Sequence, residues 1–111
     1  MNRYLDVIID FAGGGKTTGD AINTVAQYGK VVIVGMASDT AEINTMSMIL
    51  KELKFEGSQG STTADLKDCL DLLASGELDP VINVCSFDEI GEGIERLRRG
   101  EIKGRLVCVY E

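Results

Sequence analysis

Short runs of consecutive apolar residues recur along the chain, separated by polar, glycine-containing stretches. Such runs, rich in β-branched side chains, are typical of strands in a parallel sheet whose two faces are both covered. The first two runs are the most continuous, so we expect them to be buried on both faces. The predicted strands span residues 4–12, 30–35, 54–59, 81–85 and 105–110.

Between these runs, apolar residues recur at helical spacing. The first predicted helix follows a glycine-rich turn; Thr17 or Thr18 would cap it, and Gly29 would end it. Two later helices begin with the spacing of a capping box, in which a Ser or Thr precedes an acidic residue by three positions. The capping-box pairs are Thr62 with Asp65 and Ser86 with Glu89, and the predicted helices span residues 17–29, 43–53, 62–75 and 86–100.

The alternation of predicted strands and helices places the chain in the α/β class, with right-handed crossovers between parallel strands. The sequence contains no internal repeat, low-complexity segment or linker. We therefore expect residues 1–111 to form a single α/β unit.

Composition and charge narrow the range of partners and locations. The 111 residues carry a formal net charge of −7, so no electropositive surface is expected to hold nucleic acid. No apolar stretch is long enough for a membrane span or a signal peptide. The three cysteines have no CxxC spacing, which favours free thiols in a reducing cytoplasm.

The residues offer little catalytic chemistry. The sequence contains no histidine, which removes the commonest general base and the commonest zinc ligand. Acidic pairs fall on the polar faces of the predicted helices, and the cysteines read as small buried hydrophobes. We therefore assign no catalytic residue and no metal ligand.

The segment Gly15-Lys16-Thr17 follows a predicted strand and precedes a predicted helix, as the end of a phosphate-binding loop would. That loop also requires a glycine five residues before Gly15, and this chain has Asp10 there. A carboxylate at that point would oppose a bound phosphate. The pattern therefore favours a glycine-rich turn between strand and helix.

Four segments, in order, resemble the C-terminal part of the medium-chain, zinc-type alcohol dehydrogenase family. They lie between about Asp6 and Val109, and the last contains the pattern G-E-I-x-G-R-x-V. The segments are DVIIDFAGG, GKVVIVGMAS, KELKFEGSQGSTTADLKDCLDLLASGELDP and SFDEIGEGIERLRRGEIKGRLV.

The resemblance implies an oxidoreductase that moves a hydride between an alcohol and NAD or NADP. Residues 1–60 would be the second half of a doubly wound, Rossmann-type dinucleotide-binding domain. Residues 61–111 would supply the C-terminal helices and strands that return to the catalytic domain. In the family the glycine fingerprint and the zinc ligands lie upstream of this region, so we expect the chain alone to be an inactive fragment. The alternative is a stand-alone nucleotide-binding or interaction module without catalysis.

The resemblance also assigns cofactor contacts. The turn formed by Phe11, Ala12 and Gly13 would lie beside the cofactor riboses. Arg105 would reach the pyrophosphate, to which a guanidinium can donate two parallel hydrogen bonds.

Two further pairs would offer backbone groups to the nicotinamide carboxamide. These are Val34 with Gly35, and Ser58 with Gly60. Small residues at Gly35, Ser58 and Gly60 fit the close approach that such contacts need.

The family's strand order leaves the strand at residues 4–12 with an open edge in this chain. Self-association, a complementary N-terminal half, or addition of the strands at 81–85 and 105–110 to the same sheet would cover that edge. The family also pairs its last cofactor-domain strand across a two-fold axis, and residues 53–59 could keep that role. We therefore expect a homo-oligomer or a complex with the upstream half.

Overall fold

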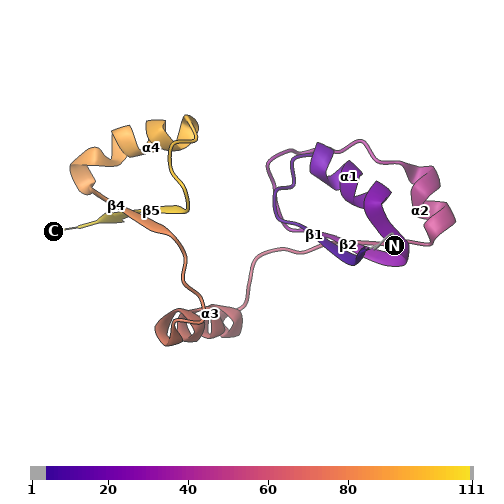
Figure 1. The fold of residues 1–111 in the computed structure, drawn as a ribbon, viewed down its shortest axis with the longest axis horizontal. Coiled ribbons are helices and arrows are strands. Elements are labelled where there is room, and N and C mark those ends of the chain that lie inside the picture. Colours follow the sequence, from indigo (N-terminus) through magenta and orange to yellow (C-terminus); the bar gives the residue numbers. More distant parts are fainter. Residues whose placement is uncertain (1–4, 111) are drawn as a thin grey trace. The chain divides into compact units, whose positions relative to one another are not determined.

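The computed structural model describes residues 5–110, whose strands form two separate parallel sheets (Figure 1). The chain divides between Gly60 and Ser61 into two units, and each unit contains one sheet. The α/β class with parallel strands is confirmed.

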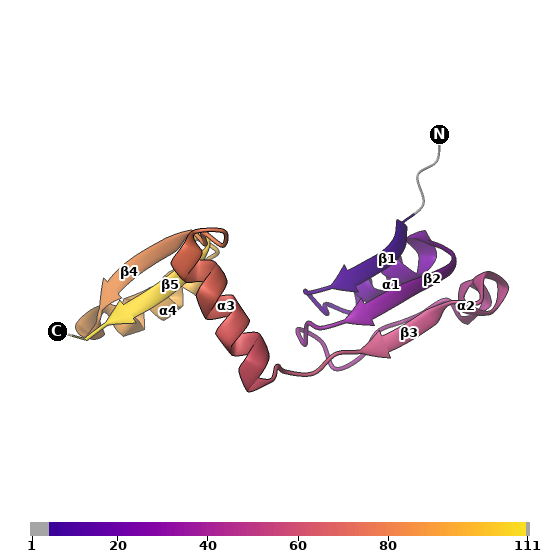
Figure 2. The ribbon, with the colours of Figure 1, turned by 90° about the horizontal axis from the view of Figure 1, so that it is seen from below.

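The first unit is built on a three-stranded parallel sheet in the order β1-β2-β3 (Figure 2). In the register of these strands, Asp10 lies opposite Ile33, which in turn lies opposite Gly57. All three strands therefore end at the same edge of the sheet. The strands are β1 (Leu5–Asp10), β2 (Val25–Ile33) and β3 (Lys54–Gly57).

Two helices, α1 (Lys16–Thr24) and α2 (Thr45–Lys51), connect these strands. The core holds Ile22 of α1 with Val25 and Val31 of β2, all fully buried. Burying each such side chain contributes about 1.5–3 kcal/mol relative to leaving it exposed. The core of this unit therefore lies between α1 and one face of the sheet.

The prediction that the first strand is buried on both faces is wrong for this chain. Leu5, Val7 and Ile9 of β1 are 53%, 54% and 49% exposed, because α1 covers only the face that carries Ile8 and Asp10. The prediction also included Tyr4, which lies outside the described residues. A continuous apolar run thus identifies a strand correctly. It does not show whether this chain itself supplies the elements that pack on both faces of that strand.

The first helix is shorter than predicted. It ends at Thr24, and the next residue, Val25, begins β2. The Lys51 ammonium donates hydrogen bonds to the carbonyl oxygens of Asn23 (2.7 Å) and Val25 (2.9 Å), groups that the helix end leaves without intrahelical partners. The predicted end at Gly29 instead falls inside β2.

The second unit contains a pair of parallel strands that bond to each other. They form a sheet of their own, so of the three alternatives for covering the open edge of β1, the addition of these strands is not the one found. Both predicted capping boxes are confirmed, at Thr62 with Asp65 and at Ser86 with Glu89. The elements are α3 (Thr63–Ser75), β4 (Ile82–Ser86), η1 (Phe87–Glu89), α4 (Ile90–Arg98) and β5 (Arg105–Val109).

No helix within residues 5–110 combines the length and the apolar character that crossing a bilayer requires.

Candidate functional site

The carboxyl edge of the β1-β2-β3 sheet gathers most of the residues singled out in the sequence. Residues 11–13 follow β1, residues 34–35 follow β2 and residues 58–60 follow β3. The strands are parallel and end in register, so these three segments leave the sheet at one edge (Figure 2). In open α/β sheets this edge is where ligands bind.

The first two of these turns are in direct backbone contact. A Cβ atom added to Gly13 would overlap the carbonyl of Gly35, and one added to Gly35 would overlap the backbone of Phe11 and Ala12. Gly13 also has a φ of 59°, which side chains other than glycine's disfavour. Both glycines are therefore needed for the turns to pack against each other, before any ligand is considered.

The carboxylate of Asp10 lies at the centre of this arrangement and is 6% exposed. Its Oδ1 accepts hydrogen bonds from the backbone N–H groups of Ala12 (3.1 Å) and Gly13 (2.9 Å). The hydroxyls of Thr17 (2.9 Å) and Thr18 (2.7 Å) donate to Oδ2. One side chain thus joins the turn after β1 to the first turn of α1.

These bonds correct the prediction that Thr17 or Thr18 caps the first helix. The N-cap position is Gly15, and neither threonine makes a side-chain cap there. Both hydroxyls instead donate to the carboxylate of Asp10, and hydrogen bonds to a charged acceptor are stronger than those between neutral groups.

The main chain of Asp10 contacts the second turn. Its carbonyl oxygen accepts from the N–H groups of Val34 and Gly35, both at 3.0 Å. The N–H of Ser58 likewise donates to the carbonyl of Ile33 at 2.9 Å. The N–H groups of these three candidate residues are therefore already used within the sheet edge.

Sequence reasoning alone misses Asp10, because in the sequence this residue is only a departure from the phosphate-loop pattern. A usable signal was present: an Asp at a strand end, followed by a turn and two threonines, can accept from nearby N–H and hydroxyl groups. The hydrogen bonds from Gly13, Thr18, Thr17 and Ala12 hold the pKa of Asp10 below its ordinary value, against the opposing effect of burial. Asp10 is therefore a carboxylate at neutral pH.

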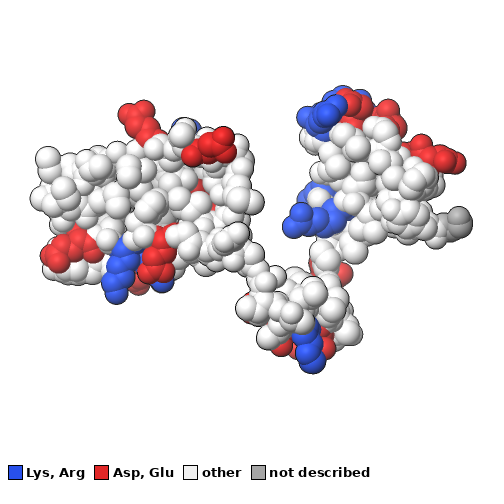
Figure 3. All heavy atoms as spheres, turned by 180° about the vertical axis from the view of Figure 1, so that it is seen from behind, with Lys and Arg blue, Asp and Glu red and all other residues white. Residues whose placement is uncertain are grey.

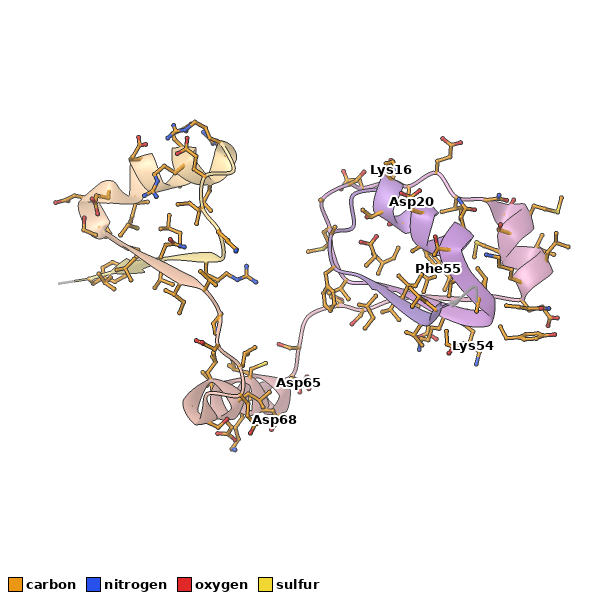
Figure 4. The ribbon with its side chains drawn as sticks, in the orientation of Figure 1. Lys16, Asp20, Lys54, Phe55, Asp65 and Asp68 are labelled. Atoms are coloured by element: carbon orange, nitrogen blue, oxygen red, sulfur yellow. The ribbon has the colours of Figure 1, made fainter. Side chains whose placement is uncertain are left out.

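The same network bears on the phosphate-loop pattern. The Gly13 N–H and the Thr18 hydroxyl, donors that a phosphate would need, already bond to Asp10. Lys16 pairs with Asp20 at 2.5 Å, and its side chain is 83% exposed (Figure 4). A cavity of about 620 Å³ includes Lys16, Asp20 and Glu42 in its wall, so it presents two carboxylates to any anion. The turn is thus built around an internal anion.

Ser58 and Gly60 lie in the exposed segment after β3. Gly60 has a φ of 60°, and nothing lies within 4 Å of a Cβ atom added there. Its glycine is favoured by backbone conformation rather than by a close neighbour.

Arg105, the remaining candidate, opens β5 in the second unit and is exposed. Its backbone N–H donates to the carbonyl of Val81 at 2.8 Å. The other seven candidates belong to the first unit, so the assignment of Arg105 stays a prediction.

The second unit adds no evident nucleophile or metal centre. Cys85 and Cys108 are register partners on β4 and β5, and burial together with the neighbouring Cys85 thiol raises the pKa of Cys108. Across residues 5–110, no three His, Cys, Asp or Glu side chains are grouped so that they could hold a metal ion. These residues therefore do not fit a zinc site.

Charged side chains of both signs lie next to one another on the surface (Figure 3). On the sheet of the first unit, Lys30 of β2 pairs with Glu56 of β3 at 2.7 Å. On α3, Lys67 pairs with Asp71 at 2.5 Å. Such exposed pairs contribute at most about 1 kcal/mol each and mark solvated faces.

Known proteins match this chain over nearly its whole length. The family model described as "Zinc-binding dehydrogenase" matches residues 1–108. The chain is 30% identical over 99 residues to an alcohol dehydrogenase of Geobacillus stearothermophilus. It is 29% identical over 101 residues to the D-arabinose 1-dehydrogenase (NADP(+)) of Saccharolobus solfataricus.

A solved structure supports the fold. The acetophenone reductase of Geotrichum candidum, in complex with NAD, matches 96% of this chain with a TM-score of 0.87 and 27% identity. The chain covers 31% of that protein. The match to the Geobacillus enzyme spans 89% of this chain and 29% of that enzyme, and the match to the Saccharolobus enzyme spans 91% of this chain and 29% of that enzyme. The matched region is thus less than a third of each relative.

The contact between the two glycines can be tested with a matched pair of substitutions. We expect Gly35→Ala to lower the free energy of unfolding by about 1–3 kcal/mol or more, because the new methyl group overlaps backbone atoms that cannot swing away. Gly57→Ala, which adds a methyl group to open space at the end of β3, should change it by less than about 1 kcal/mol. Urea unfolding measures both, and equal losses would contradict the contact.

The acid response of the first unit can be tested with Asp10→Asn. A carboxyl whose folded pKa lies below its unfolded value of 3.8 stabilises the fold above that value, and this contribution disappears as the pH falls through the folded pKa. The wild type should therefore lose more stability than Asp10→Asn between about pH 5 and about pH 2. Hydrogen exchange of the core amides reports this difference, and parallel curves for the two proteins would refute it.

Proposed function

We propose that this chain, which belongs to the zinc-binding dehydrogenase family and matches the C-terminal part of medium-chain, zinc-type alcohol dehydrogenases, forms one side of a nicotinamide-cofactor site. The reaction would be hydride transfer between an alcohol and NAD or NADP. The observation that carries this proposal is the interlocked pair of turns at the carboxyl edge of the sheet. The NAD complex of the acetophenone reductase, which has the same fold, supports the choice of cofactor class.

The residues of the first unit would position the cofactor through their backbone. The turn of Phe11, Ala12 and Gly13 would lie beside the riboses. The N–H groups of Val34, Gly35 and Ser58 are engaged within the protein, so these residues would offer carbonyl oxygens to the nicotinamide carboxamide. A carboxamide NH₂ carries two donors, which suits carbonyl acceptors on two neighbouring turns.

Gly60, in the exposed segment after β3, would contribute its backbone to the same carboxamide. Arg105 would supply two donors to the pyrophosphate, from the start of β5. When bound, the nicotinamide ring supplies the hydride chemistry itself. The chain's own residues would fix its orientation and leave the reacting face to a partner.

The chain would need an upstream half to catalyse hydride transfer. Its described residues provide no set of zinc donors, and the sequence has no histidine. The part that this chain matches is about three tenths of the length of its relatives. We therefore propose that the chain alone is inactive and that the catalytic groups come from the complementary N-terminal half.

Both edges of the first sheet offer places for partners. β1 and β3 are its outer strands, and an outer strand presents backbone groups that another strand can pair with. We propose that the upstream half covers β1, whose side chains are half exposed on the face away from α1. A second copy would pair along β3. The free thiols of the chain fit a reducing, cytoplasmic location.

Cofactor binding tests the proposal directly. Calorimetric titration of the purified chain with NADH and NADPH should give a dissociation constant of about 1 mM or tighter for at least one of them. ATP should not bind at the glycine-rich turn, because Asp10 already occupies its donors. Arg105→Ala should weaken cofactor binding about tenfold, as loss of a charge-assisted contact does.

Lys67→Ala serves as a charge-matched control, because it removes one positive charge from α3 without touching a candidate contact. Unchanged affinity of Arg105→Ala would remove Arg105 from the site. Absence of binding by both nicotinamide cofactors would contradict the proposal and favour an interaction module, and ATP binding would favour the phosphate-loop alternative.

Assembly is tested by light scattering at micromolar concentration, where we expect a homodimer or a larger species. A lysine on an outer strand opposes edge pairing. Phe55→Lys, on β3, should therefore shift the protein toward monomer, whereas Val7→Lys, on β1, should leave self-association in place. A wild-type protein that is already monomeric would rule out the β3 interface, and loss of assembly only in Val7→Lys would place self-association on β1.

A further inference from the structure

Asp10 makes an unusual combination of contacts for a buried carboxylate. It is held by two backbone N–H groups and two hydroxyls, and none of the ion pairs among residues 5–110 includes it. Burying a charge without a cation is costly unless hydrogen bonds replace its water. The four donors supply that replacement, and the carboxylate in return fixes each donor in place.

The donors belong to the two sides of a single loop. Ala12 and Gly13 form the turn after β1, whereas Thr17 and Thr18 belong to the first turn of α1. The carboxylate therefore sets how the turn lies against the helix. Both Ala12 and Gly13 lie against the backbone of Gly35, so the position of the first turn fixes that of the second.

The carbonyl of Asp10 gives the second connection. It accepts from Val34 and Gly35, the residues that follow β2. The side chain and the main chain of one residue thus bind the two turns on which the proposed cofactor site depends. In the described part of the chain, Gly13, Val34 and Gly35 all hydrogen-bond to Asp10.

We propose that Asp10 is a positioning residue for the cofactor site, which holds the turns at 11–13 and 34–35 in the arrangement that receives the nicotinamide and its ribose. This inference rests on the proposed function. Asp10 does not contact the cofactor in this account, because its carboxylate oxygens are turned to the protein's own donors. Its removal therefore weakens cofactor binding through the geometry of the turns.

The test compares three variants of the 111-residue chain. Asp10→Ala removes every acceptor of the side chain, and Asp10→Asn keeps one oxygen for the Ala12 and Gly13 amides. Ile22→Val removes one methylene from the buried core, away from both turns, and serves as the control for lost stability. NADH fluorescence gives the dissociation constant, under conditions where urea unfolding shows each variant to be folded.

We expect Asp10→Ala to weaken NADH binding by about tenfold or more, as the loss of hydrogen bonds to a charged acceptor does, and Asp10→Asn to recover part of the loss. Ile22→Val should bind as the wild type does. Amide hydrogen exchange supplies an independent signature: exchange at Ala12, Gly13, Val34 and Gly35 should rise together in the Asp10 variants and not in Ile22→Val.

The outcomes separate this inference from the proposed function. Wild-type affinity in folded Asp10→Ala, or in folded Asp10→Asn should Asp10→Ala not fold, would overturn the positioning role while leaving the cofactor site in place. If the wild type binds neither NADH nor NADPH, the proposed function fails, and hydrogen exchange alone tests the role of Asp10. Faster exchange at both turns then supports positioning of the turns by Asp10, and unchanged exchange overturns it. Equal loss of affinity in Ile22→Val and the Asp10 variants would also overturn it.

Discussion

The structure of the first unit depends on the close approach of two backbone turns at the carboxyl edge of its sheet. Gly13 and Gly35 meet where neither has room for a side chain. Asp10, the last residue of β1, hydrogen-bonds to both turns. The approach is possible only because β1 and β2 are parallel and end in register. Sheet register, glycine content and one buried acid are thus parts of a single constraint.

Much of the secondary structure was predictable because its signals are local. The capping boxes at Thr62 and Ser86 each need only four consecutive residues, and both are present as predicted. The stretch around Val25 was assigned wrongly because its apolar residues fit a helical face as well as a buried strand. Pairing with β1 and the reach of Lys51 from α2 decide that boundary, and neither is visible within a local window.

The candidate site was predictable to a different degree. The resemblance to a family pointed to seven residues that follow three strands, and the structure brings those strand ends to one edge. It did not point to Asp10, because a family's contact residues are those that touch the ligand, whereas Asp10 acts one step behind them. The small size of Gly35 was expected for the sake of a ligand but is required by the backbone of Ala12. The role of Arg105 stays a prediction.

The half-exposed strand β1 has a consequence for the tendency of the chain to aggregate. Its side chains Val7, Ile8 and Ile9 are β-branched and without an intervening charge or proline, which is the composition of segments that stack into cross-β aggregates. Asp6 and Asp10 flank this segment, and such flanking charges act as gatekeepers against stacking. Asp10, however, is turned inward by its hydrogen bonds and protects little of the surface. Asp6 and the net charge of −7 are therefore the features of this sequence that oppose stacking along β1.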